Sequence, residues 1–280
     1  ARDAIQRASV TSSGLAIALS TDVRGRMLQA IFDKGAWRTA AVALPENGHI
    51  VLHETDPDLS MAFATYEGFL QPTSLYAVDF KAAPKPIMQL PAKFNSDTLV
   101  VEQFEATSRD GTRVPYFVVS PKNLRLDGSA PTLLYAYGGF QVAQFPSYSP
   151  TLGRLWLEQG GVYVLANIRG GGEFGPAWHQ AGLKTKRQVV YDDFIAISED
   201  LIARKITSAR RLGIRGGSNG GLLMGVMLSQ RPELFRGVIV QVPLLDMLRY
   251  HKLLAGASWV DEYGSPEVAE ERAWLERLSP

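Results

Sequence analysis

Residues 211–225 read RLGIRGGSNGGLLMG and place a single serine, Ser218, between two pairs of glycines with an apolar run on each side. The preceding run, Leu212–Arg215, predicts a strand, and the following run, Gly220–Gln230, predicts a helix. A G-x-S-x-G pattern between a strand and a helix is typical of a nucleophile elbow, where glycines remove Cβ atoms that would collide with the neighbouring elements. We therefore interpret Ser218 as an exposed nucleophile. The alternative is an ordinary glycine-rich turn.

The same turn predicts a place for negative charge. A helix starting after Ser218 would direct its first amides toward the serine, and the Asn219 N–H would be one donor to an oxyanion. A second donor would come from the loop after another strand, Thr132–Tyr137, which runs on into Gly-Gly-Phe. The Tyr137 hydroxyl is our candidate. Alternatively, Tyr137 is a packed aromatic residue at a strand end.

Strands and helices alternate from about residue 98 onward, after a hairpin of the segments 100–107 and 113–120. The strands are apolar on both faces, which favours a mostly parallel sheet covered by helices on each side, an α/β architecture. The remaining predicted strands are 161–167 and 238–242, and the remaining predicted helices are 151–159, 192–205 and 245–254.

The first part of the chain reads differently. Up to about residue 90 it holds short alternating strands separated by turns, as in a sandwich, a barrel or propeller blades. The segment Lys81–Phe94 carries three prolines and reads as a linker. We therefore predict two domains, 1–90 and 91–280. The predicted strands of the first are 14–19, 26–32, 37–44, 49–53, 61–66 and 74–80.

Composition excludes several classes of function. The net charge of +1 and the lack of a dense basic tract argue against a nucleic-acid partner, and Lys184, Lys186 and Arg187 read as a solvated loop. Cysteine is absent, so thiolate metal sites are excluded, and we expect no metal and no cofactor. No apolar run approaches the roughly 18 residues of a membrane span, so we expect no membrane partner. We expect a cytoplasmic protein, with the periplasm as the alternative.

Two other patterns could suggest chemistry. Gly170–Gly175 fits G-x-G-x-x-G, but Pro176 interrupts the turn into a helix and the acidic residues Asp192 and Asp193 read as helix caps, so we prefer a structural loop to a dinucleotide site. The four histidines read as structural. They are His49, His53, His179 and His251.

The partners that a serine nucleophile needs are missing from this stretch. On a hydrolase sheet the order is Ser, then Asp or Glu, then His, each after a different strand. Asp246 and His251 have this order but share one segment, so they cannot come from two strand ends. We expect the triad acid and base to lie beyond Pro280, and a fragment without them to be inactive alone.

These motifs together resemble the prolyl oligopeptidase family of serine peptidases. The resemblance covers about residues 104–280, and the strand-rich start, including FLQPTSLYAVDF at 69–80, resembles the last blades of the family's β-propeller. The motifs that carry it are YAYGGF (135–140), ANIRGGGEFGPAWH (166–179), YDDF (191–194), GGSNGG (216–221), QRPELF (230–235) and ASWVDEYG (257–264).

The resemblance implies an incomplete α/β-hydrolase domain preceded by partial propeller blades. It implies Ser218 as nucleophile, with Asn219 N–H and the Tyr137 hydroxyl as oxyanion donors. It also implies a proline pocket in which Trp259 stacks on the ring and Phe140 and Tyr263 form further walls, so that short proline-containing peptides are cut after proline. Asp261 and Glu262, beside Trp259, keep open a preference for basic residues.

Alternatives to this function are a broader acyl-peptide hydrolase or esterase on the same fold, and a non-catalytic fragment. We expect a protein more than twice as long as this chain, monomeric at full length.

Overall fold

The computed structural model describes residues 2–280, which form two compact units. The first comprises residues up to Asp97 together with Phe145–Leu155, and the second comprises Thr98–Gln144 together with Trp156–Pro280. Each unit has its own hydrophobic core, so each is described by itself.

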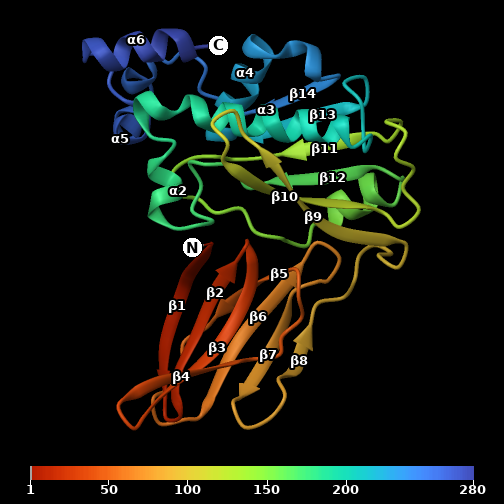
Figure 1. Cartoon of the computed structure of the whole chain (residues 1–280), viewed down its shortest axis with the longest axis vertical. Helices are drawn as coiled ribbons and strands as arrows, with labels where there is room; N and C mark the ends of the chain where they lie inside the picture. The colour runs from red at the N-terminus through yellow and green to blue at the C-terminus, as the bar shows by residue number, and fades with distance from the viewer. Residues whose placement is uncertain (1) are drawn as a thin grey trace. The chain divides into compact units, whose positions relative to one another are not determined.

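The first unit contains two four-stranded antiparallel sheets, each a meander in chain order (Figure 1). Alternate residues of the central strands point inward, and the two sheets share a core of alanine, larger aliphatic and aromatic side chains such as Ala16, Ile50, Ala64 and Tyr66. This alternation is what the period-two pattern predicts for strands with one buried face. The strands are β1 (Asp3–Thr11), β2 (Gly14–Thr21), β3 (Arg24–Asp33), β4 (Ala36–Ala41), β5 (Gly48–Leu52), β6 (Met61–Gly68), β7 (Ser74–Asp79) and β8 (Lys85–Gln89).

Two strands of this unit differ from the sequence prediction. β1 was not predicted, because its mixed polar sequence leaves most of its side chains exposed or half-exposed. β8 lies inside the proline-rich segment that we predicted to be a linker. It pairs with β7 only, and Pro86 sits opposite Tyr76 beside a bulge in the register. Proline is tolerated on an edge strand, where one side of the backbone needs no partner.

The second unit is built on a six-stranded mixed sheet in the order β14-β13-β11-β12-β10-β9. β11, β12, β13 and β14 are mutually parallel where they pair, and β9 and β10 add an antiparallel edge. The predicted mostly parallel sheet is confirmed. The strands are β9 (Leu99–Thr107), β10 (Arg113–Pro121), β11 (Thr132–Tyr135), β12 (Val162–Ala166), β13 (Leu212–Gly217) and β14 (Gly237–Gln241).

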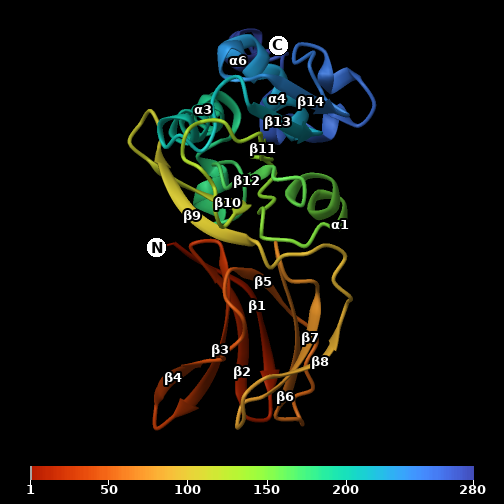
Figure 2. The ribbon, with the colours of Figure 1, turned by 90° about the vertical axis from the view of Figure 1, so that its right-hand side faces the viewer.

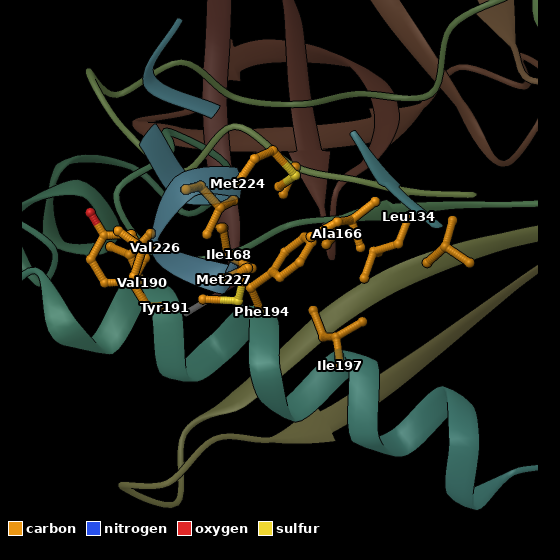
Figure 3. Close-up of a cluster of buried hydrophobic side chains, with 14 of the residues drawn as sticks. Leu134, Ala166, Ile168, Val190, Tyr191, Phe194, Ile197, Met224, Val226 and Met227 are labelled. Atoms are coloured by element: carbon orange, nitrogen blue, oxygen red, sulfur yellow. The ribbon is translucent and has the colours of Figure 1, made fainter. Parts of the chain in front are cut away.

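Two long helices pack on this sheet. α3 (Gln188–Ala203) contacts β9 and β10, and α4 (Asn219–Gln230) contacts β13 and β14, as Figure 2 also shows. Phe194 and Ile197 of α3 and Met224 and Met227 of α4 are fully buried in the core beneath them (Figure 3). The remaining helices are α1 (Pro150–Leu152), which continues as a π-helical turn (Gly153–Leu157), α2 (Pro176–Gln180), α5 (Val260–Tyr263) and α6 (Ala269–Leu278).

The helix predictions were partly wrong. Residues 151–159 form only one short α-helical segment and the π-helical turn. The segment 245–254 contains a single 3₁₀ turn, Tyr250–Lys252, because Asp246 accepts a hydrogen bond from the Arg249 N–H and closes a local turn that competes with a helix. Pro176 starts α2 instead of interrupting it, since proline suits the first helical turn.

Candidate active site

Ser218 lies at the corner between β13 and α4, in a backbone conformation with φ 55° and ψ −117°. A non-glycine residue rarely adopts this conformation, and strain of this kind is concentrated at functional sites. The corner is held from both sides, because the Ser218 N–H donates to the Gln241 carbonyl of β14 (3.0 Å) and its own carbonyl accepts the Gly221 and Leu222 amides. The side chain is exposed. The structure therefore presents this hydroxyl to solvent on a strained turn.

The glycines around Ser218 are explained by close backbone contacts. A Cβ at Gly216 would overlap the Gly220 carbonyl oxygen, and a Cβ at Gly220 would lie 2.8 Å from the Ala136 carbonyl oxygen. Gly221 would similarly approach the Gln241 carbonyl oxygen at 2.8 Å. A Cβ at Gly217 would meet nothing closer than 3.7 Å. Three of the four glycines thus have a steric reason, which is the reason that the motif predicts.

Ser218 opens into a cavity of about 410 Å³ whose walls are mostly apolar. Trp259, at the end of a 3₁₀ turn (Gly256–Trp259), lines the same cavity. The structure thus brings the predicted nucleophile and the predicted stacking residue together. The other lining residues are Val242, Pro243, Leu244, Leu245, Asp246, Tyr250, Leu253 and Leu254.

The predicted oxyanion donors come from two adjacent segments. Asn219 is the first residue of α4, where a backbone N–H has no acceptor within the helix. Its side chain is buried and donates from Nδ2 to the Tyr137 carbonyl oxygen (2.6 Å). The Tyr137 segment is therefore tied directly to the residue after Ser218. The Tyr137 side chain is half-buried.

A fully buried arginine lies behind these segments. Arg187 donates to Asn219 Oδ1, to the Gly138 carbonyl oxygen (3.2 Å) and to Glu262 Oε1 (2.9 Å). Its side chain is 1% exposed and that of Glu262 is 5% exposed, so this ion pair is shielded from water. Burial would lower the pKa of Arg187, but its anionic and phenolic neighbours raise it, so the guanidinium is charged. The prediction that Arg187 lies in a solvated loop was wrong.

Glu262 contacts two further residues. Besides Arg187, it accepts the Phe140 N–H (3.0 Å) at Oε1 and contacts His179 Nε2 (2.7 Å) at Oε2. Its carboxylate faces away from solvent. Asp261, next to it, is exposed.

Phe140 and Tyr263 are packed together but do not line the Ser218 cavity. Their rings meet edge to face with centroids 5.6 Å apart. Tyr263 is completely buried, donates its hydroxyl to Asn219 Oδ1 (2.9 Å) and lies beneath the Arg187 guanidinium. Phe140 has a φ of 56° and is partly buried. Their assignment as pocket walls stays a prediction.

The histidines of this unit are engaged with carboxylates. His179 contacts Glu262, and His251 Nε2 contacts Glu267 (3.0 Å). Asp246 lines the Ser218 cavity but pairs with Arg249, which lowers the pKa of its carboxyl. Ser218 makes no side-chain hydrogen bond to a histidine within residues 2–280.

The glycine-rich loop 170–175 supports the site from the side. A Cβ at Gly170 or Gly172 would overlap the backbone of Gly138 or Gln141, so this loop lies directly against the loop after β11. The preceding Arg169 is buried and pairs with Asp193, which is inside α3 and does not cap it as predicted. The structural interpretation of this loop fits these contacts.

Glu173, in the same loop, is an unusual carboxyl. It accepts the Gln144 N–H (2.9 Å), but Glu173 Oε2 and the neighbouring Asn167 Oδ1 are buried without a hydrogen-bond partner. Burial raises the pKa of Glu173 to about 7, against hydrogen bonds that lower it.

Within the described range, residues 2–280, no group of three or more His, Asp or Glu side chains is arranged to hold a metal ion. None of the helices in that range is long and apolar enough to cross a bilayer.

Sequence reasoning missed Arg187 and Glu262 as organising residues of this region. For Arg187, the one indication in the sequence was its position just before the apolar residues at the start of α3. Those residues pack inward and would bring the aliphatic part of the arginine with them. No local pattern indicates that two residues 75 positions apart form a buried pair.

Comparison with known proteins identifies the parts of the chain. Residues 146–280 match the model described as prolyl oligopeptidase family, and residues 1–91 match the model of its N-terminal β-propeller domain. The chain is 52% identical over 271 residues to the uncharacterized peptidase y4nA of Sinorhizobium fredii, covering 96% of this chain and 37% of that protein. It is 38% identical to a prolyl endopeptidase of Elizabethkingia meningoseptica, covering 89% of this chain and 36% of that protein.

A solved structure has the same fold. A post-proline cleaving enzyme from Rickettsia typhi superposes with a TM-score of 0.91 at 41% identity, covering all of this chain and 41% of that chain. This chain thus spans about two-fifths of the length of these relatives. The predicted fold class, an α/β-hydrolase-type sheet preceded by propeller strands, is confirmed by these matches. The chain belongs to the prolyl oligopeptidase family of peptidases.

Proposed function

We propose that this chain is part of a serine peptidase that cuts short peptides on the carboxyl side of proline, with Ser218 as nucleophile. The observation that carries this proposal is the shared cavity of about 410 Å³, in which Ser218 is the exposed hydroxyl and Trp259 is an aromatic wall. A peptide carbonyl next to Ser218 would place its preceding side chain in this apolar space. Proline, whose ring offers no N–H, suits such a slot.

The proposed reaction follows from the geometry of the corner. Ser218 Oγ attacks the carbonyl carbon and gives its proton to a general base, and the carbonyl oxygen becomes an oxyanion. The Asn219 N–H and the Tyr137 hydroxyl receive this charge. Collapse of the intermediate releases the amine, which takes the proton, and leaves an acyl-enzyme. Water then attacks the acyl carbon and the base takes a water proton. As the bond from Ser218 Oγ to the acyl carbon breaks, the base returns that proton to Oγ and the carboxylic acid departs.

The cavity supports proline over a basic residue. Glu262, the buried carboxylate three residues after Trp259 in sequence, already pairs with Arg187 and contacts His179, so its charge is compensated within the protein. The cavity is lined mainly by leucine, valine, proline and tryptophan, and its one carboxylate, Asp246, is already paired with Arg249. We propose Trp259 as the stacking wall and the partly exposed Phe140 as a further wall, with the buried Tyr263 packed edge to face behind it.

The general base and its acid partner are proposed to lie outside residues 2–280. His179 and His251 are paired with Glu262 and Glu267, and Asp246 is paired with Arg249. Without a base, a serine hydroxyl attacks poorly, so we propose that residues 1–280 alone are inactive.

The test uses the full-length protein and a chromogenic Gly-Pro amide. We expect cleavage after proline, stoichiometric labelling by a fluorophosphonate, and loss of both in Ser218→Ala. Cleavage that survives in Ser218→Ala would refute the nucleophile. Equal rates for Gly-Pro and Gly-Ala amides, with Ser218 still required, would favour a broad acyl-peptide hydrolase.

A further inference from the structure

We propose that Arg187 is the positioning residue that holds both halves of the oxyanion site in register. This rests on the proposed function of Ser218, since it explains how that site is built. The guanidinium does not touch the substrate; it acts through the segments that carry Tyr137, Asn219 and Trp259.

Three separate segments meet at this one side chain. Arg187 donates to the Gly138 carbonyl oxygen (3.2 Å) in the loop after β11, to Asn219 Oδ1 at the start of α4, and to Glu262 Oε1 (2.9 Å) in α5. These are the segments that carry the two predicted oxyanion donors and the predicted stacking residue. Apart from Asn219 itself, which bonds directly to the Tyr137 carbonyl and to the Tyr263 hydroxyl, no other described side chain joins all three.

The contacts around Asn219 leave it little freedom. Its Oδ1 receives Arg187 and the Tyr263 hydroxyl (2.9 Å), and its Nδ2 donates to the Tyr137 carbonyl oxygen (2.6 Å). Gly139 is packed so closely against this side chain that a Cβ there would lie 2.5 Å from Nδ2. A shift of the Arg187 head would therefore move Asn219 and the Tyr137 segment relative to each other.

Arginine is required here because of its shape. A planar guanidinium offers five donors in a fixed fork, so one group can bind three acceptors that lie in different directions. A lysine ammonium keeps the charge beside Glu262 but is a point donor on a flexible stem, and it cannot hold the same three acceptors in fixed positions. Arg187→Lys therefore separates positioning from charge neutralisation.

Misplaced oxyanion donors affect the transition state more than the bound substrate. The ground-state carbonyl needs little from them, whereas the developing charge depends on their placement within a fraction of an ångström. We expect Arg187→Lys to lower kcat by about 10- to 100-fold with KM within about threefold. The rate of fluorophosphonate labelling of Ser218 should fall by a similar factor.

The matched control is Arg169→Lys in the same full-length protein. Arg169 is also a buried arginine, paired with Asp193 of α3, but it is not bonded to the Tyr137, Asn219 or Glu262 segments. Arg169→Lys should lower the unfolding midpoint without a selective loss of kcat. If Arg187→Lys does not fold, the second variant is the Arg187→Gln/Glu262→Gln double substitution, which leaves no uncompensated buried charge. It should show the same selective loss of kcat relative to Glu262→Gln alone.

The outcomes separate the two proposals. If Arg187→Lys loses activity only in proportion to its folded fraction, as Arg169→Lys does, or changes KM alone, Arg187 is a purely structural residue and this inference is wrong. Substrate preference does not enter this comparison, because the labelling rate of Ser218 is measured without a peptide. Wild-type protein that is labelled at Ser218 but does not cut after proline would refute the proposed substrate and leave the Arg187 comparison valid.

Discussion

The Phe140 amide donates a hydrogen bond of 3.0 Å to the Glu262 carboxylate, which lies 122 residues further along the chain. Through this bond, short helix α5 fixes the loop that follows β11. The same carboxylate neutralises Arg187, so a single acidic side chain serves both the geometry and the charge balance of the region.

Glu262→Gln should destabilise the second unit strongly. Removing one charge of a buried pair leaves the other uncompensated, which typically costs about 3–5 kcal/mol. Urea unfolding of the full-length protein, monitored by tryptophan fluorescence, measures the change. Glu267→Gln is the control, because Glu267 is 64% exposed and solvent screens its pairs with His251 and Lys252, so its loss should change stability little. Equal effects of the two substitutions would contradict the buried pair.

Gly216→Ala and Gly217→Ala should differ although the two glycines are adjacent. The Cβ at 216 overlaps the Gly220 carbonyl oxygen, whereas at 217 the nearest atom is 3.7 Å away. We expect Gly216→Ala to cost about 1–3 kcal/mol and most of the Ser218 labelling, and Gly217→Ala to stay within about 0.5 kcal/mol of wild type. Thermal unfolding and fluorophosphonate labelling of both variants check this. Full labelling of Gly216→Ala would show that the elbow can relax.

Trp259→Ala should lower kcat/KM for a proline substrate by about 100-fold, since the loss of an apolar contact surface of this size is worth about 2–3 kcal/mol. The reference reaction is cleavage of the matching alanine substrate by the same variant, which should fall less than about fivefold because a methyl group makes little contact with the indole. A parallel loss for both substrates would argue against stacking on the proline ring.

Glu173→Gln should remove a pH dependence of stability. The folded-state pKa of about 7 is above the ordinary value of 4.5, so the folded form binds more protons than the unfolded form between these values. Stability from the neutral carboxyl is therefore fully present below about pH 4.5 and is lost as pH rises through 7. Glutamine keeps an acceptor for the Gln144 N–H and cannot ionise.

The measurement for Glu173 is the free energy of unfolding of wild type and Glu173→Gln from pH 5 to 8. As pH rises across this range, the free energy of unfolding of the variant should increase relative to that of wild type by up to roughly 3 kcal/mol. Parallel curves for the two proteins would mean that Glu173 ionises normally in the folded state.

Features that depend on consecutive residues were predicted from the sequence, and features that depend on contacts between distant segments were not. The Ser218 corner was predicted because strand, glycines and helix are consecutive in sequence. Three of its four glycines are explained by close backbone contacts within the motif or with the neighbouring segments. β8 was missed because a strand tolerates proline only at the edge of a sheet, and the sequence of one segment does not reveal whether it forms an edge. The segment 245–254 was misread because its leucines line a cavity, and apolar periodicity does not distinguish a cavity wall from the buried face of a helix.

The contacts of Arg187 with Gly138, Asn219 and Glu262 could not be predicted for a related reason. Lys184, Lys186 and Arg187 look alike in composition, yet the two lysines are half-buried or exposed and Arg187 is fully buried. Arg187 differs from the two lysines because the turn before α3 directs its side chain inward. There it meets Glu262, which is distant in sequence and close in the folded chain. Long-range charge pairing of this kind is a property of the assembled structure.

The backbone angles at Ser218 have a consequence for evolution and for engineering. A φ of 55° with a ψ of −117° is allowed for glycine but strained for residues with a side chain, at a cost of order 1–3 kcal/mol. Ser218→Gly should accordingly unfold at a higher temperature than wild type, while Ser218→Ala should not. Stability alone would favour glycine at this corner, so the serine there supports the proposed role of its hydroxyl as nucleophile.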